Sequence, residues 1–129
     1  MENNDTALAA QSVPVAQNIV GDMFAKMTKD VEYTPLPNGW IYACFSFLDR
    51  FNDAIGIYMK IEGDKVLFSD DGEAVDTFLL GGKDLHDVEV YAKTHGVKLV
   101  GEELQLETTR ALASASMADF LACVVSLSY

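Results

Sequence analysis

The sequence predicts an α+β fold, in which an antiparallel sheet with a central hairpin at about residues 55 to 69 combines with helices. Residues 55 to 61 alternate between apolar and polar side chains, and turn residues follow them directly. The chain has 129 residues, half of them hydrophobic, which is enough for one core but not for two. We therefore expect a flexible arm over residues 1 to 11 and a single domain over residues 12 to 129.

The first helix is expected over residues 13 to 28. Ser12 precedes it as a candidate N-cap, and Pro14 suits its first turn. Its apolar positions recur at a spacing of four: Val15, Ile19, Met23 and Met27. We expect this face of the helix to pack into the core.

A strand is expected over residues 40 to 47, after the breakers Pro35, Pro37 and Gly39. This run is rich in aromatic and β-branched residues and is apolar at both odd and even positions. It reads as a central strand that is buried on both faces.

The hairpin is the clearest local signal. Ile55, Ile57, Met59 and Ile61 alternate with smaller or polar residues, and Gly63-Asp64 supplies a two-residue turn before residues 65 to 69 return. The turn fixes three cross-strand pairs: Glu62 with Lys65, Ile61 with Val66, and Met59 with Phe68.

Two short helices and a second hairpin are expected next. Asp71-Gly72 can cap a helix that ends at Leu80 before Gly81-Gly82. A second helix fits residues 85 to 95, with Asp84 as its N-cap. Residues 97 to 107 form a smaller hairpin about Gly101-Glu102, which sets Leu99 against Leu104 and Val97 against Leu106.

The last expected helix runs from about residue 109 to residue 127. It carries a stripe of small residues: Ala111, Ala115, Ala118 and Ala122. Small side chains permit close helix packing, either within the monomer or across a homodimer. We favour packing within the monomer, and a homodimer through this helix stays open.

Charge is the unusual bulk property. The net charge is −11, and residues 49 to 89 hold eleven acids against four bases. Such a field repels nucleic acid and attracts basic protein surfaces. The simpler alternative is a solubilising acidic face, which many proteins carry.

Three carboxylates are candidates for chemistry, because Asp53 precedes one hairpin strand and Asp70 and Asp71 follow the other. Carboxylates at strand ends are suited to hold Mg²⁺ in a hydrolase or nuclease. However, the acid and lysine two residues apart that nucleases use do not follow Asp70. We favour helix capping by Asp70 and Asp71 over catalysis, and we expect no metal and no cofactor.

Cys44 and Cys123 lie in apolar runs without a second ligand nearby, and they read as buried free thiols in a reducing cytoplasm. The N-terminus lacks a signal-peptide pattern, and residues 120 to 127 are too short to span a bilayer. We expect a cytoplasmic protein that binds neither membrane nor nucleic acid directly.

Four aromatic residues remain candidates for a contact surface, unless a second layer of the fold covers them: Tyr33, Trp40, Phe51 and Tyr58.

The hairpin region also resembles a known family. It contains Thr34-Pro35, Asp49-Arg50-Phe51-Asn52-Asp53, Ile55-Gly56-Ile57-Tyr58 and Leu67-Phe68-Ser69-Asp70-Asp71-Gly72. This progression is similar to that of the phage and bacterial family catalogued as domain of unknown function 1828. The resemblance covers residues 34 to 72 and implies a phage, prophage or bacterial origin, with no established reaction or cofactor. It matches Asp53, Asp70, Asp71 and Gly72 to the family's recurring positions.

The leading hypothesis is a non-enzymatic acidic binding protein of phage or mobile-element type. Its candidate binding residues are Asp53, Asp70, Asp71, Gly72, Glu73 and Asp76. The partner is expected to be a basic bacterial protein, and one version is DNA mimicry that inhibits a defence protein at its nucleic-acid site. The alternatives are the metal-dependent hydrolase or nuclease and a structural homodimer.

Overall fold

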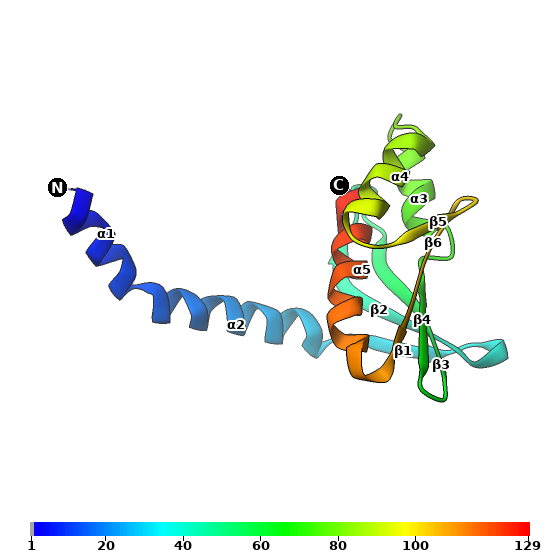
Figure 1. Cartoon of the computed structure of the whole chain (residues 1–129), viewed down its shortest axis with the longest axis horizontal. Coiled ribbons are helices and arrows are strands. Elements are labelled where there is room, and N and C mark those ends of the chain that lie inside the picture. Colours follow the sequence, from blue (N-terminus) through cyan, green and yellow to red (C-terminus); the bar gives the residue numbers. More distant parts are fainter. Residues whose placement is uncertain (1) are drawn as a thin grey trace.

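The computed structural model describes residues 2 to 129, with the side chains of residues 6 to 46 and 48 to 129. Its centre is a six-stranded antiparallel sheet with the strand order β1-β2-β3-β4-β6-β5 (Figure 1). The strands are β1 (Glu32–Pro35), β2 (Trp40–Leu48), β3 (Ala54–Glu62), β4 (Lys65–Ser69), β5 (Lys98–Val100) and β6 (Glu103–Thr109). The α+β prediction is therefore confirmed.

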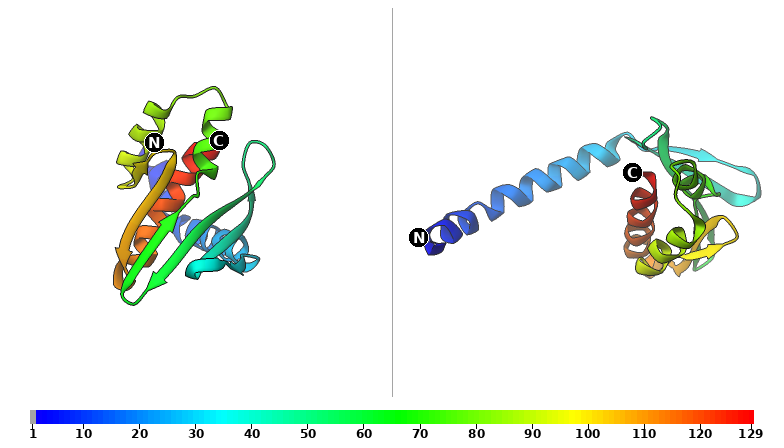
Figure 2. Two further views of the ribbon diagram at one scale, coloured as in Figure 1. Left: turned by 90° about the vertical axis from the view of Figure 1, so that its right-hand side faces the viewer. Right: turned by 90° about the horizontal axis from the view of Figure 1, so that it is seen from above.

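Three helices cover one face of the sheet: α3 (Glu73–Leu80), α4 (Leu85–Thr94) and α5 (Ala113–Ser128) (Figure 2). Their inward side chains join those of the sheet in one core cluster, whose centre includes Ile57, Val75, Val88, Leu104 and Phe120. Phe120 stacks on Phe68 of β4 with ring centroids 5.9 Å apart. Burial of this apolar surface is the main force that holds the helices to the sheet.

The central hairpin has the predicted register. Glu62 lies opposite Lys65, Ile61 opposite Val66 and Met59 opposite Phe68. Ile55 and Ile57 are buried as expected, whereas Ile61 near the turn is 45% exposed. A two-residue turn fixes the pairing locally, so the register is readable from sequence alone.

The expectation for β2 is correct for the strand but wrong for its burial. Ala43 and Phe45 face the core and are buried, while Trp40, Tyr42 and Cys44 on the other face are only half-buried. In the described part of the chain no helix covers that second face (Figure 2). Cys44 is thus a half-buried free thiol, whereas Cys123 in α5 is a buried one, as expected.

The N-terminal region departs most from expectation. Residues expected to form a flexible arm are helical in α1 (Glu2–Gln11), and α2 (Val13–Lys29) follows almost without interruption. Ser12 does not cap α2, because it has helical dihedrals and its hydroxyl donates to the Leu8 carbonyl. The helix over residues 13 to 28 is confirmed, but α2 extends away from the sheet (Figure 1).

The face of α2 that we expected to be core is exposed. Val15, Ile19 and Met23 are 60%, 64% and 45% exposed, and only Met27 near β2 is half-buried. The spacing of four correctly identified one apolar face of a helix. It did not identify what that face contacts.

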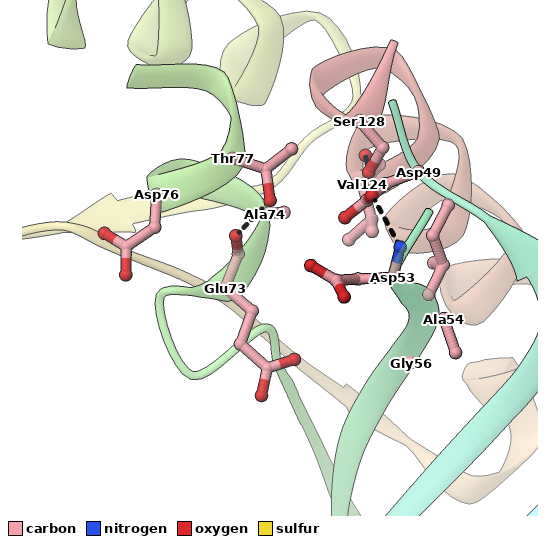
Figure 3. A pocket seen from close by; sticks show the side chains of 11 residues that line it. Asp49, Asp53, Ala54, Gly56, Glu73, Ala74, Asp76, Thr77, Val124 and Ser128 are labelled. Carbon is pink, nitrogen blue, oxygen red and sulfur yellow. Dashed lines mark hydrogen bonds between the residues drawn. The ribbon is translucent and has the colours of Figure 1, made fainter. Parts of the chain in front are cut away.

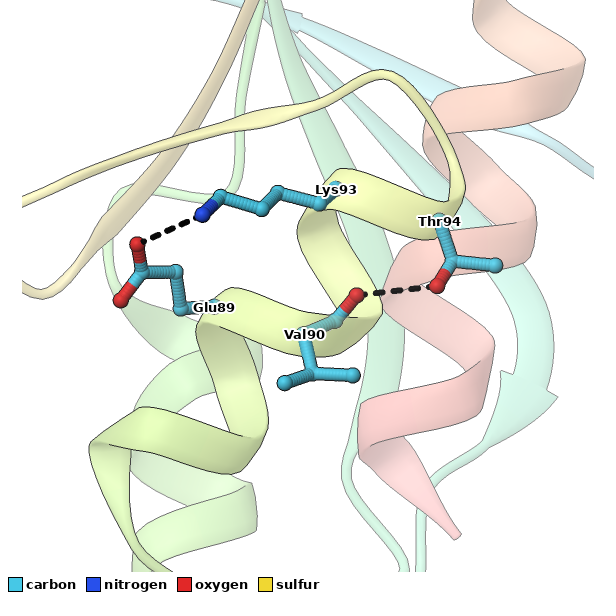
Figure 4. Close-up of polar contacts among 4 residues, drawn as sticks. All are labelled: Glu89, Val90, Lys93 and Thr94. Carbon is cyan, nitrogen blue, oxygen red and sulfur yellow. Dashed lines mark hydrogen bonds and ion pairs between the residues drawn. The ribbon is translucent and has the colours of Figure 1, made fainter.

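The middle helices and the second hairpin follow the sequence. The Asp84 carboxylate accepts a hydrogen bond from the Asp87 amide and caps α4, and Leu99 pairs with Leu104. Val97 lies outside β5, so its expected pairing with Leu106 does not form part of the ladder. The outer surface of α4 carries the Glu89–Lys93 ion pair at 3.2 Å (Figure 4).

The expected last helix is confirmed as α5, preceded by the 3₁₀ turn η2 (Arg110–Leu112). The preferred role of its small residues is wrong, because Ala111, Ala115, Ala118 and Ala122 are all exposed. Residues on the opposite side of the helix, including Phe120 and Leu127, fill the core. The small-residue stripe is therefore not part of the core of the monomer.

We expect Phe120→Ala to lower the free energy of unfolding by about 3–5 kcal/mol, because it removes a fully buried ring and leaves a cavity against Phe68. Chemical denaturation measures this loss. Leu80→Ala is the control, since Leu80 is 77% exposed and its change should stay within about 0.5 kcal/mol. Equal losses for the two variants would contradict the assigned core.

Candidate functional site

Asp70 at the end of β4 is a buried anchor for three elements. Its side chain is 1% exposed. Oδ1 accepts hydrogen bonds from the amides of Gly72 at 2.9 Å and Leu104 at 2.8 Å. Oδ2 accepts from the amides of Ala74 at 3.1 Å and Val75 at 3.2 Å. One carboxylate thus ties the end of β4 to the first turn of α3 and to β6.

Asp71 and Gly72 form the left-handed turn that starts α3. Asp71 has φ +51° and Gly72 has φ +78°, and a Cβ on Gly72 would come within 3.3 Å of the Glu102 carbonyl. Glycine suits this position because it lacks both the Cβ and the strain of a positive φ. The Asp71 side chain is exposed, so the helix cap comes from Asp70 rather than Asp71.

Asp70 is buried, and each of its carboxylate oxygens accepts two amide hydrogen bonds, so neither oxygen is free to bind a ligand. Burial raises the pKa of Asp70 above its ordinary value, and the four amide donors act in the opposite direction. Among the residues with described side chains, no three His, Cys, Asp or Glu residues are grouped so that they can hold a metal ion. The metal hypothesis for Asp53, Asp70 and Asp71 therefore gains no support.

Four carboxylates line a cavity of about 320 Å³ beside Asp70's turn. Asp49 and Asp53 come from the loop before β3, and Glu73 and Asp76 come from α3 (Figure 3). Asp53 points across the cavity toward α3, whereas the Asp76 carboxylate points outward. We call this hollow the acidic cavity; its remaining lining is Ala54, Ile55, Gly56, Ala74, Thr77, Val124 and Ser128.

Backbone interactions of the loop position its carboxylates. Asp49 Oδ1 accepts hydrogen bonds from the amides of Phe51 at 2.8 Å and Asp53 at 3.1 Å, an arrangement typical of Asp in turns. Within the described part of the chain, no ion pair involves any of the four cavity carboxylates. The acidic cavity is therefore a concave surface of negative charge.

A second hollow lies on the face of the sheet opposite the helices. Its volume is about 370 Å³, and it is lined by Leu36, Pro37, Trp40, Tyr58, Ser69, Asp71 and Glu103. We call it the aromatic groove. Two of the four aromatic candidates, Trp40 and Tyr58, meet there, whereas Tyr33 and Phe51 do not line it.

A tyrosine connects the aromatic groove with the acidic cavity. The Tyr58 hydroxyl donates to Glu73 Oε1 at 2.6 Å, and the Tyr58 and Tyr42 rings have centroids 4.7 Å apart. Burial and the neighbouring Glu73 charge raise the pKa of Tyr42 to about 12 and raise the pKa of Tyr58 as well. Both phenols therefore remain protonated at neutral pH, and Tyr58 keeps Glu73 oriented as an acceptor.

The six sequence-based site residues thus separate into three groups. Asp53, Glu73 and Asp76 share the acidic cavity, Asp71 lies in the aromatic groove, and Asp70 and Gly72 form the turn between them. Sequence reasoning did not select Asp49, although its position four residues before Asp53 in one loop was the available signal. Glu103 offered no comparable signal, because β6 is far from β4 in sequence.

Comparison with protein families assigns most of the chain to one family. Residues 46 to 127 match the family model described as domain of unknown function DUF1828. The chain belongs to this family. No curated protein matches the chain, and no solved structure matches it.

The DUF1828 region includes most of the site. It begins within β2 and ends within α5, so it contains all four cavity carboxylates and the Asp70 turn. The sequence resemblance rested on residues 34 to 72, whereas the family model also covers the helices that close the core. Helices α1 and α2 and strand β1 lie outside the matched residues.

We expect Asp70→Asn to lower the free energy of unfolding by about 2–4 kcal/mol. The side-chain NH₂ of Asn cannot accept hydrogen bonds, so backbone amides that Asp70 now satisfies lose their acceptor. A buried donor without an acceptor costs about 1–3 kcal/mol. Asp71→Asn is the matched control and should stay within about 0.5 kcal/mol, since Asn tolerates a left-handed φ. Urea denaturation of both variants measures the difference. A smaller loss for Asp70→Asn than for Asp71→Asn would refute the anchoring role.

Proposed function

We propose that this DUF1828 protein is a non-enzymatic binding protein that takes a basic side chain of a partner protein into the acidic cavity. The observation that carries the proposal is the arrangement of Asp49, Asp53, Glu73 and Asp76 around one hollow. A Lys or Arg side chain offers several donors to carboxylate oxygens, and Arg can bind one carboxylate with two parallel hydrogen bonds.

The electrostatics of the cavity support this choice of ligand. The cavity carboxylates attract a cation, and none of them forms an ion pair with another described residue. The surrounding field has the same sign, because residues 49 to 89 carry eleven acids and four bases. Such a field raises the association rate with a basic surface and discriminates against acidic ones.

A narrower form of the proposal concerns the identity of the partner. The basic partner is a bacterial nucleic-acid-binding protein, and the acidic surface occupies its nucleic-acid site as a mimic of DNA. Spaced carboxylates replace phosphates in such a role. On this proposal the protein acts as an inhibitor of phage or mobile-element type, against a defence protein of the host.

The test is affinity capture from a bacterial lysate with wild-type protein and a cavity variant, Asp53→Asn/Glu73→Gln/Asp76→Asn. We expect wild type to capture a protein with a basic binding site at low salt, and to lose it at high salt, because the Debye length falls from about 10 Å at 0.1 M to about 3 Å at 1 M ionic strength. The cavity variant should lose the partner at both salt concentrations. Added duplex DNA should displace the partner if the narrower proposal is correct.

The control variant removes the same number of charges from exposed positions away from the cavity: Glu62→Gln/Glu89→Gln/Glu102→Gln. It should retain the partner at low salt. Equal loss of the partner in both triple variants would show that the interaction depends on net charge alone. Capture that is unchanged by high salt and by the cavity variant would refute the proposal. Capture that survives excess DNA would refute mimicry while it leaves the cavity as a protein-binding site.

A further inference from the structure

Helix α2 presents a wide apolar face that the monomer leaves uncovered. None of its seventeen residues, all of which the structure describes, is buried. The exposed apolar side chains are Val13, Val15, Ile19, Val20, Met23 and Phe24. At 100° per residue these positions spread over about half of the helix circumference, which is broader than the narrow seam of a two-stranded coiled coil.

This helix has little intrinsic stability. β-branched residues are frequent in it, and Gly21 lies near its middle; both residue types have lower helix propensity than Ala or Leu. Helices in proteins draw most of their stability from packing of the apolar face, and isolated helices of similar length are marginal in water. A folded α2 therefore requires a surface that covers its apolar face.

Helix α5 offers a second uncovered surface. The segment Arg110–Ser128 is long and apolar enough to cross a membrane by length and composition. Only 28% of its most apolar stretch is buried in the fold. Its exposed side lies opposite the core-facing Phe120 and Cys123, and it carries Ala111, Ala115, Ala118 and Ala122. These small residues leave room for the large side chains of another helix to approach closely.

The distribution of charge indicates that the covering partner is a second copy of this chain. Residues 30 to 109 hold sixteen acids and six bases, so the sheet and α3–α4 resist self-association. The two uncovered helices do not: α2 carries Asp22, Lys26 and Lys29, and α5 carries Asp119. The net charges of α2 and α5 (Ala113–Ser128) are small and opposite in sign, so two copies can bring these two apolar surfaces together without strong repulsion.

We propose that two copies form a dimer in which α2 of each copy packs on the exposed face of α5 of the other. In the monomer α2 extends away from its own α5 (Figures 1 and 2). A stable interface buries roughly 800 Å² per partner, more than one helix contact of this length supplies. Two-fold symmetry repeats the contact, because each copy both donates α2 and receives it on α5.

This inference is independent of the acidic cavity, and its first test is molar mass in solution at low and high protein concentration. Wild type should give twice the chain mass of 14.1 kDa. Ile19→Glu and Ala118→Glu should each give the monomer mass, because each places a charge in the interface from one of its two helices. Asn18→Glu on the polar side of α2 is the matched control and should remain dimeric.

Two results would overturn the proposed dimer. One is a monomer mass for wild type at every concentration, and the other is a dimer mass for both glutamate variants. Circular dichroism checks that each variant keeps its helices and its cooperative melt. A variant that fails this check is replaced by Phe24→Ser or Ala115→Gln, which address the same two faces.

A cross-linking experiment identifies the surfaces. Ile19 and Ala118 lie near the middles of their helices, so they come close whichever way the helices run. Copies with Ile19→Cys and copies with Ala118→Cys, both in a Cys44→Ser background, are mixed and treated with a flexible bismaleimide. We expect a cross-link between the two variants in the mixture. A cross-link in Ile19→Cys alone would mean that α2 pairs with α2, which contradicts the proposed arrangement.

Discussion

The architecture depends on one carboxylate. Asp70 is buried at the end of the central hairpin and accepts four backbone amide hydrogen bonds, from Gly72, Ala74, Val75 and Leu104. Those amides belong to the turn, to the first turn of α3 and to β6, elements that are brought together only in the folded chain. The first amides of a helix have no partner within the helix, so a buried α3 N-terminus needs such an acceptor. Without it, three elements would lose their common point of attachment.

The same anchor sets the geometry of the candidate site. Asp70 fixes where α3 begins, and α3 carries Glu73 and Asp76 to the side of the loop that carries Asp49 and Asp53. Asp71, one residue from the anchor, points instead to the aromatic groove beside Trp40 and Tyr58. A buried carboxylate with a structural role thus organises the exposed carboxylates around it. This division explains why a short acidic motif contains residues with different roles.

Local patterns in the sequence predicted the elements well. Gly63-Asp64 and the alternation before it gave the hairpin register, because a two-residue turn determines which residues pair. Asp84 was correctly expected to cap α4, since a cap involves neighbours three residues apart. The family resemblance was also correct, and it extends over residues 46 to 127. For the site, the acidic segment predicted three of the four cavity carboxylates, while Asp49 and the aromatic groove required contacts between distant segments.

What the sequence by itself determined is the set of elements, the central register and the acidic character of the chain, because turns, caps and periodicity act between residues close in sequence. Only the tertiary structure decided which apolar faces are covered. Ile19 in α2 and Ile57 in β3 lie in similarly regular apolar patterns, yet one is 64% exposed and the other is fully buried. Periodicity shows that a face is apolar, but its burial depends on what packs against it. The separation of Asp70 from Asp71 has the same cause, since Leu104, more than thirty residues away, supplies one of the amides that bury Asp70.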